Sequence, residues 1–275
     1  MDITRTLLND VIELSVQAGE AILDVYNSDR GFNTVEKADS SPVTDADHAA
    51  HNLLLPALSQ IEPNVPVLSE ESNLPDFETR ASWGTYWIID PLDGTKEFIK
   101  RNGEFTVNIA LIKNNVPVLG VVHVPVVGIT YAGADGLGAM RIDAAGETQI
   151  STRRVSPSSD KPLTVVASRS HGSEAVENCM ENLGKVFPDI HRQSMGSSLK
   201  LCLVAAGEAD LYPRLAPTSE WDTAAAQAVV EAAGGVVLDA DLAPLRYNTK
   251  ADILNPWFYV IGDPSFDWPS VLSSN

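Results

Sequence analysis

The stretch from Asn114 to Ala134 carries no formally charged residue, and its interpretation decides between a membrane protein and a soluble one. A helix that spans a bilayer needs about 20 consecutive apolar residues. Here prolines and glycines interrupt the run, and valine is abundant between them. Valine-rich segments between turn residues are typical of strands. We therefore predict strands over Pro117–His123 and Val126–Ala132, and no membrane span.

Helical and extended segments alternate along the rest of the chain. Apolar residues recur at helical spacing over residues 7–25, and a second helix is expected over residues 44–59. Around Ala144–Lys161 the composition shifts to Gly, Ser, Thr, Arg, Asp and Pro, which is typical of a boundary between structural units. We therefore divide the chain into an N-terminal α+β part, residues 1–150, and a C-terminal α/β part, residues 151–275.

The net charge of −18 argues against one class of partner. Binding to a nucleic-acid polymer needs a basic surface, so no such polymer is expected. A phosphorylated small molecule is compatible with this charge, because bound metal ions reverse the local sign at a site. Neither GxGxxG nor GxxxxGK[ST] occurs, so the sequence gives no support to a Rossmann or P-loop site.

An apolar strand predicted over Thr85–Ile89 leads directly into the sequence DPLDGT, residues 90–95. The proline and the glycine are expected to end the strand, which brings two carboxylates and a hydroxyl to one turn. Magnesium prefers oxygen ligands in near-octahedral geometry. Asp90 and Asp93 could bind one or two such ions, with the Leu92 carbonyl as a further ligand. For the motif alone, an ordinary turn is an equally good interpretation.

Further acidic residues occur where predicted strands end or predicted helices begin. Glu70 and Glu71 follow a short predicted strand, and a solvated loop is the simple alternative for them. Asp47 follows Thr44 by three residues, as in a capping box. Asp222 opens an alanine-rich helix, where capping and interaction with the helix dipole would explain an acidic residue.

Taken together, these residues resemble the inositol monophosphatase superfamily of metal-dependent, lithium-sensitive phosphatases. Glu70-Glu71, DPLDGT and Trp221-Asp222 occur in the family's order and spacing over nearly the whole chain. Inositol monophosphatases usually continue DGT with Thr-Asn-Phe, whereas this chain has Lys96-Glu97-Phe98 and is more similar to the bacterial 3′(2′),5′-bisphosphate nucleotidases of the CysQ type. The same group is indicated by Asn102–Ala110, Ser168–His171, Gly196–Lys200, Tyr212–Arg214 and Glu220–Ala225.

The resemblance implies a role for each matching position. Thr95 and Asp47 would orient and deprotonate the attacking water, and His171 lies where a histidine contacts the base. Ser197, Lys200 and Arg214 match positions that bind the substrate's phosphate groups. The expected metal ligands are Glu70, Asp90, Leu92 (through its carbonyl), Asp93 and Asp222. The expected substrate contacts are Glu70, Leu92, Asp93, Gly94, Thr95, His171, Ser197, Lys200, Arg214 and Asp222.

The resemblance also implies a layered α/β/α/β/α fold, two or three Mg²⁺ ions per site, and hydrolysis of the 3′-phosphate of adenosine 3′,5′-bisphosphate (PAP). Its sulfated analogue PAPS would be a second substrate, which places the enzyme in sulfur metabolism. An inositol-1-monophosphatase or another sugar phosphatase of the superfamily is the alternative. A catalytically silent cation-binding module is a further one, against which the water-activating pair Asp47 and Thr95 counts.

Expectations for assembly come from the resemblance, and those for location come mainly from the residues themselves. Members of the family include monomers and homodimers. Cys179 and Cys202 form no CxxC pair, and the first residues lack the features of a secretory signal, so a reducing cytoplasm is expected. Some relatives are found peripherally at the cytoplasmic face of the inner membrane.

Overall fold

The computed structural model describes residues 2–29, 31–36, 42–167 and 174–272. Its helices are α1 (Arg5–Tyr26), α2 (Asp45–Ile61), α3 (Phe77–Ala81), α4 (Thr95–Ile99), α5 (Glu174–Gly184), α6 (Leu199–Ala205), α7 (Glu220–Ala232) and α8 (Pro269–Leu272). Its strands are β1 (Thr34–Glu36), β2 (Pro42–Thr44), β3 (Val67–Ser69), β4 (Thr85–Asp93), β5 (Thr106–Lys113), β6 (Val116–Val124), β7 (Ile129–Ala134), β8 (Gly138–Asp143), β9 (Gly146–Ile150), β10 (Leu163–Ala167), β11 (Ile190–Ser194), β12 (Leu211–Arg214), β13 (Val236–Asp239) and β14 (Phe258–Ile261).

The larger sheet contains seven strands in the order β3-β4-β5-β6-β7-β8-β9. β3 pairs in parallel with β4, and the other neighbours are antiparallel. Asn114 and Asn115 both have positive φ angles and join β5 to β6 by a two-residue turn. Turns of this kind match the twist of a hairpin. The uncharged stretch therefore forms the centre of an antiparallel sheet.

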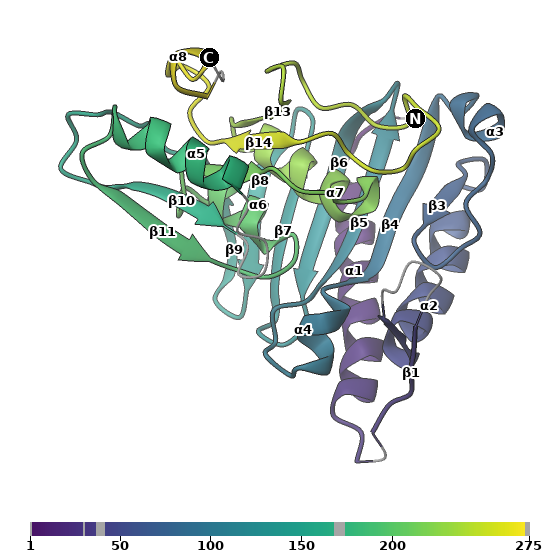
Figure 1. Cartoon of the computed structure of the whole chain (residues 1–275). Helices are drawn as coiled ribbons and strands as arrows, with labels where there is room; N and C mark the ends of the chain where they lie inside the picture. Colours follow the sequence, from purple (N-terminus) through teal and green to yellow (C-terminus); the bar gives the residue numbers. More distant parts are fainter. Residues whose placement is uncertain (1, 30, 37–41, 168–173, 273–275) are drawn as a thin grey trace.

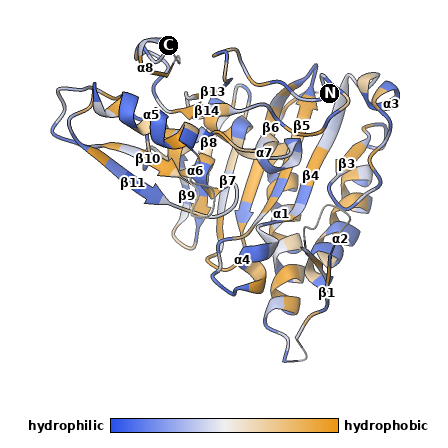
Figure 2. Ribbon diagram, in the orientation of Figure 1, coloured by the Kyte–Doolittle hydropathy of each residue, from blue (hydrophilic) through white to orange (hydrophobic). Residues whose placement is uncertain are grey.

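Side chains of this sheet alternate between two helical layers. Trp87 and Ile89 of β4 pack with α1 and α2, whereas Tyr86 and Ile88 belong to the cluster that contains α7. Successive strand residues point to opposite faces, so a sheet covered on both faces needs almost continuous apolar strands. Figure 2 shows this as mainly orange strands in the centre, whereas the surface helix α5 mixes blue and orange.

Helix α7 lies unusually close to this sheet because the contact is made by glycine and alanine. A Cβ atom added to Gly120 would lie 2.0 Å from the Ala225 carbonyl oxygen, and one added to Gly133 would lie 2.8 Å from the Val229 Cα. Only a residue without a side chain fits at these positions. The alanine-rich composition of α7 is thus a packing requirement, and it determines where Asp222 lies.

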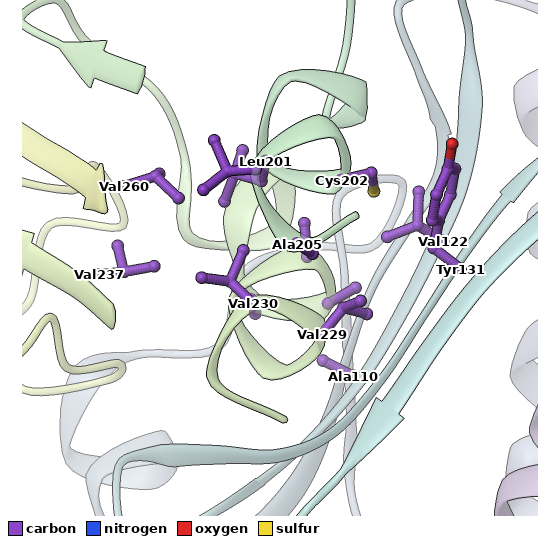
Figure 3. Packing of buried hydrophobic residues seen from close by; sticks show 14 of the residues in the cluster. Ala110, Val122, Tyr131, Leu201, Cys202, Ala205, Val229, Val230, Val237 and Val260 are labelled. Carbon is purple, nitrogen blue, oxygen red and sulfur yellow. The ribbon is translucent and has the colours of Figure 1, made fainter. Parts of the chain in front are cut away.

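The smaller of the two layered sheets contains five strands in the order β11-β10-β12-β14-β13, and β1 and β2 form a separate antiparallel pair. Residues of β10, β12 and β14 pack on one face against α5 and α8, with Cys179 and Trp268 in that cluster. On the other face, Val237 and Val260 pack against α6 and α7. Figure 3 shows the labelled residues Leu201, Val230 and Val260 meeting on this side.

The order of layers is therefore α1/α2, the seven-stranded sheet, α6/α7, the five-stranded sheet, and α5/α8 (Figure 1). This confirms the predicted layered α/β/α/β/α fold. Cys202 is fully buried in the middle layer, as a core residue. The strands of the larger sheet precede residue 151 and those of the smaller sheet follow it, but one hydrophobic cluster contains side chains from both sheets.

The strands differ from the sequence predictions around the uncharged stretch and in the predicted boundary segment. The predicted strand Val126–Ala132 begins only at Ile129, because Val124–Gly128 forms a turn in which Gly128 has a φ of +63°. The predicted boundary segment Ala144–Lys161 contains β9, whose polar and exposed residues give no hydrophobic signal. Among the described helices, none combines the length and apolar composition that a bilayer crossing requires.

Candidate active site

The DPLDGT segment is not a simple turn, because β4 continues through Pro91 to Asp93. Asp90 pairs with Asn108 of β5 and Asp93 pairs with Thr106, so two residues of β4 lie opposite one residue of β5. Such a β-bulge leaves an unpaired position, where a proline costs no hydrogen bond. The prediction that the strand ends at the proline was therefore wrong.

Three carboxylates gather at the end of this strand. Glu70 follows β3, Asp90 lies in β4 and Asp222 lies in the first turn of α7, and one potential ligand atom from each lies within 4.8 Å of the others. Glu70 and Asp222 are half-buried, whereas Asp90 is only 2 % exposed. Asp222, more than 130 positions from the other two along the chain, thus joins Glu70 and Asp90 in one acidic cluster.

The electrostatics of this cluster fit a divalent cation. Burial raises the pKa of Asp90 well above its usual range, and the nearby charges of Glu70, Asp93 and Asp222 raise it further. Closely spaced carboxylates in a dry site repel each other unless they are protonated or bind a cation. The potential ligands are all oxygen atoms, which are those that Mg²⁺ prefers.

Asp93 belongs to the same group of charges and is held from the opposite half of the molecule. Its Oδ2 accepts a hydrogen bond from the backbone N–H of Ser198 at 2.6 Å. Burial and then the charge of Asp222 raise the pKa of Asp93 to about 7, although Lys200 and the Ser198 N–H lower it.

Asp222 serves two purposes at the beginning of α7. Its Oδ2 accepts the backbone N–H of Ser219 at 2.9 Å and the hydroxyl of Thr218, which completes a capping box. Capping was the alternative explanation for this residue, and the structure shows that capping and membership of the acidic cluster coexist. The positive end of the helix dipole also stabilises the carboxylate there.

Asp47 and Thr95 lie beside the cluster and contact each other. Asp47 forms the predicted capping box, because its Oδ2 accepts the Thr44 N–H at 2.8 Å and the Thr44 hydroxyl at 2.6 Å. Its other oxygen, Oδ1, accepts the Thr95 hydroxyl at 3.1 Å. Gly94, in the left-handed conformation at a φ of +96°, redirects the chain so that Thr95 begins α4. Burial raises the pKa of Asp47, which makes its carboxylate a stronger base.

A cavity of about 280 Å³ opens next to the acidic cluster. Asp93, Gly94 and Asp222 line it together with Ser197, Lys200 and Arg214. Carboxylates and cations therefore face the same space. The arrangement can accommodate a ligand that carries negative charge, provided that a metal ion compensates the carboxylates.

Three cationic residues line the cavity, Lys96, Lys200 and Arg214, and the last two are placed differently. The Lys200 ammonium is buried and donates to the Ser197 carbonyl at 2.7 Å; burial lowers its pKa to about 8, so it is still largely charged at neutral pH. Arg214 donates from Nη2 to the Pro217 carbonyl at 2.6 Å. Its Nε is covered by protein atoms and has no hydrogen-bond partner among the described residues.

The other predicted site residues are placed as follows. The Leu92 carbonyl lies 3.5 Å from the Thr95 hydroxyl, within the bulged segment. Ser197 has a φ of +44°, which is uncommon for serine. His171, with the whole segment Ser168–His171, lies outside the described residues.

Sequence reasoning assigned no role to several residues that the structure brings to the site. Thr218 contacts Asp222, Tyr212 lines the cavity beneath the Lys200 ammonium, and Ser198 contacts Asp93. Thr218 could have been identified from its position just before a helix that begins with acidic residues. No local signal indicates the contact between Ser198 and Asp93, because 105 positions separate them.

Comparisons with known proteins agree with this geometry. A sequence profile described as the inositol monophosphatase family matches residues 4–258. The 3′(2′),5′-bisphosphate nucleotidase CysQ of Escherichia coli (strain K12) is 48 % identical over 254 residues, which cover 92 % of this chain and 99 % of that protein. The CysQ protein of Haemophilus influenzae is 36 % identical over the full length of both chains. The crystal structure of CysQ from Bacteroides thetaiotaomicron superposes with a TM-score of 0.83 at 43 % identity, covering 94 % of this chain and 97 % of that one.

Proposed function

The chain belongs to the inositol monophosphatase family, and we propose that it is a 3′(2′),5′-bisphosphate nucleotidase that converts PAP to AMP and phosphate. The observation that carries this proposal is a cavity beside the acidic cluster that Asp93 and Asp222 line together with Lys200 and Arg214. A bisphosphorylated nucleotide presents one phosphate for hydrolysis and a second for recognition. The carboxylates, together with their metal, suit the first phosphate, whereas Lys200 and Arg214 suit the second.

Members of this family depend on metal ions, typically Mg²⁺, and we assign two or three such ions to this site. Glu70, Asp90, Asp93, Asp222 and the Leu92 carbonyl would hold them. When bound, the ions supply the positive charge that neutralises phosphate oxygens and lowers the pKa of a coordinated water. The mutual repulsion of the carboxylates supports this assignment, since a divalent cation removes it.

Thr95 and Asp47 would prepare the attacking water. The Thr95 hydroxyl donates to Asp47, so its oxygen lone pairs are available to accept a proton from a water on the other side. Asp47 would then receive the Thr95 proton as the water loses its own. The cap contacts from Thr44 hold the carboxylate in place for this transfer.

On the substrate side, the Arg214 guanidinium, Ser197 and Lys200 all line the cavity and would contact one phosphate group. Met195 and Tyr212 add an apolar wall to the cavity. His171 is proposed to contact the base on the resemblance alone.

The direct test is phosphate release in the presence of Mg²⁺ from PAP, PAPS, inositol 1-phosphate and fructose 1,6-bisphosphate. We expect kcat/KM to be highest for the bisphosphorylated nucleotides. Faster turnover of inositol 1-phosphate would instead show that the enzyme acts as an inositol-1-monophosphatase within this family. Asp93→Asn tests the metal assignment: we expect a folded variant that has lost phosphatase activity, and mostly intact turnover would overturn the assignment.

Action on PAPS and a role in sulfur metabolism complete the proposal, with a cytoplasmic location and a monomeric or homodimeric state. The sulfur role can be tested by measuring the growth of a strain that lacks this protein on sulfate and on a reduced sulfur source. A defect restricted to sulfate would support the sulfur role.

A further inference from the structure

A buried polar cluster joins the two halves of the molecule beside the acidic cluster. Thr106 and Asn108 lie on β5 of the seven-stranded sheet, and Ser198 lies just before α6. Their exposed fractions are 0 %, 1 % and 2 %, respectively. We call these three residues the hydroxyl–amide cluster. Neither the proposed reaction nor the packing of the two sheets requires polar side chains here.

The hydrogen bonds within this cluster orient the Asn108 amide. The Asn108 Oδ1 accepts the Ser198 hydroxyl at 2.9 Å and the Thr106 hydroxyl at 3.1 Å, and the two hydroxyl oxygens lie 2.9 Å apart. An amide oxygen with two hydroxyl donors leaves the amide nitrogen on the opposite side. The Asn108 Nδ2 accordingly faces the Asp93 Oδ2 at 3.5 Å.

The backbone of Ser198 is directed at the same carboxylate. Its N–H donates to the Asp93 Oδ2 at 2.6 Å, the length of a strong bond to an ionised group. Ser197 has a φ of +44° and Ser198 a φ of −67°, so the chain turns sharply immediately before α6. The Ser198 N–H that meets Asp93 lies at this turn.

The loop that contains Ser198 is fixed at a second point and leads to the substrate side of the cavity. The Gly196 N–H donates to the Glu104 Oε2 at 2.8 Å, and the Lys200 ammonium donates to the Ser197 carbonyl at 2.7 Å. A shift of Ser198 would therefore move Asp93 on one side and Ser197 and Lys200 on the other.

We propose that Ser198 is a positioning residue for metal binding: its hydroxyl, anchored on Asn108 and Thr106, keeps its N–H on the Asp93 carboxylate. Through this bond the substrate loop and a metal ligand move together. The inference rests on the proposed function only in taking Asp93 as a metal ligand. It predicts that loss of a remote hydroxyl weakens Mg²⁺ binding.

A merely structural role makes a different prediction at Thr106. Thr106→Val preserves the shape of the side chain and removes the hydroxyl, whereas Thr106→Ser preserves the hydroxyl and removes the methyl group. If the cluster only fills space, Thr106→Ser should disturb the site more than Thr106→Val, because it leaves a small cavity. If the cluster positions Asp93, Thr106→Val should lose Mg²⁺ affinity and Thr106→Ser should retain it.

The experiment measures Mg²⁺ binding alone by isothermal titration calorimetry, and then the Mg²⁺ concentration for half-maximal phosphate release from PAP. Outer partners of metal ligands change metal affinity by about 10–100-fold. We expect about a tenfold loss for Ser198→Ala, a smaller loss of about threefold for Thr106→Val, and a change within about twofold for Thr106→Ser. Ser15→Ala is the matched control, because this fully buried serine donates only to the Ile12 carbonyl within α1.

Ser198→Ala and Thr106→Val with Mg²⁺ affinities like that of Ser15→Ala would overturn the inference, even if both variants were less stable. If Ser198→Ala does not fold, the ranking of the two Thr106 variants decides. If the parent protein fails to hydrolyse PAP but the variants lose Mg²⁺ binding as described, the proposed function fails and the inference holds.

Discussion

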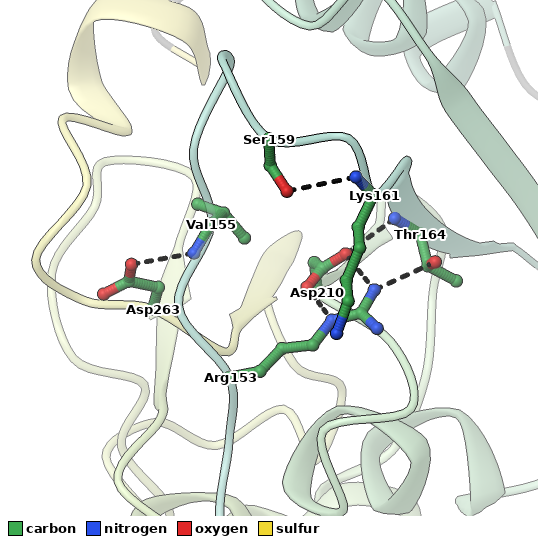
Figure 4. A network of polar contacts seen from close by, with 7 residues as sticks. All are labelled: Arg153, Val155, Ser159, Lys161, Thr164, Asp210 and Asp263. Carbon is green, nitrogen blue, oxygen red and sulfur yellow. Dashed lines mark hydrogen bonds and ion pairs between the residues drawn. The ribbon is translucent and has the colours of Figure 1, made fainter.

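Asp90 and Asp210 are both 2 % exposed, yet their surroundings are opposite. Asp210 accepts hydrogen bonds from the Arg153 Nε and Nη2 at 2.5 and 2.6 Å and from the Thr164 N–H at 2.7 Å (Figure 4). Asp90 accepts the Leu92 N–H at 3.0 Å, and its charged neighbours are other carboxylates. One buried aspartate is compensated within the protein, and the other is not.

The difference shows that burial of a charge does not by itself indicate function. The pair of Arg153 and Asp210 fastens the segment before β10 to the five-stranded sheet, and the Val155 N–H contacts Asp263 in the same region (Figure 4). Asp90 would destabilise the fold unless a cation or a proton joined it. The aspartate without a positively charged partner, Asp90, therefore indicates where a cation binds.

The largest effect is expected for Asp90→Asn, which removes a proposed metal ligand. We expect kcat/KM for PAP to fall by at least about a hundredfold, because the metal contributes several kcal/mol of charge stabilisation in such reactions. In the presence of EDTA the variant should be more stable than the parent, since one of the repelling charges is gone. Thermal midpoints and initial rates provide both measurements. A variant that lost both activity and stability would contradict the view that Asp90 is uncompensated in the metal-free protein.

Arg153→Met should produce the opposite combination. It leaves Asp210 buried without its partner, and breaking such a pair costs about 3 kcal/mol of unfolding free energy. Catalysis per folded molecule should stay within about twofold, because the pair does not line the active-site cavity. Urea denaturation followed by circular dichroism measures the first quantity, and assays at low temperature measure the second. Undiminished stability would mean that Asp210 needs no compensation.

Adding Mg²⁺ should distinguish the two regions in one experiment. A ligand at 100 times its dissociation constant stabilises the folded state by about 2.7 kcal/mol. We expect this gain in the parent and in Arg153→Met, and much less in Asp90→Asn. The increase of the thermal midpoint with Mg²⁺ concentration measures it. Ca²⁺ at equal concentration serves as a comparison for selectivity.

The smallest effect is the pH dependence of the metal-free protein. Asp93 has a pKa of about 7 in the folded state, above its ordinary value of 3.8, so the folded state binds more protons between these values. The stability that protonated Asp93 contributes to the folded state is therefore fully present below pH 3.8 and is lost as the pH rises through 7. The free energy of unfolding falls over this interval by at most about 1.4 kcal/mol per pH unit. His123, whose pKa burial lowers to about 4, contributes with the opposite sign.

The comparison of the parent with Asp93→Asn in EDTA removes the contribution of His123, which is common to both. Urea denaturation at pH 5 and pH 7 measures the difference. We expect the parent to lose more stability than the variant over this interval, and Mg²⁺ to abolish the difference. Equal slopes without metal would show that Asp93 is compensated in the folded protein.

Local features were predictable wherever a few neighbouring residues determine them. The predicted strand Pro117–His123 lies within β6, and the predicted capping box of Thr44 and Asp47 is present. The bulge at Pro91 was not predictable, because its stability depends on pairing with β5. β9 was missed for a related reason: its polar residues become a strand only because β8 is available as a partner.

The sequence by itself determined the chemical inventory of the site: the acidic positions at the ends of predicted elements, the caps, and through resemblance the family and its layered fold. Only the tertiary structure decided which buried charges are compensated. Arg153 reaches Asp210 across 57 positions, and Ser198 reaches Asp93 across 105. The reason is physical: capping and periodicity depend on residues within one or two helical turns, whereas burial and charge compensation depend on how the two sheets and the helices between them pack.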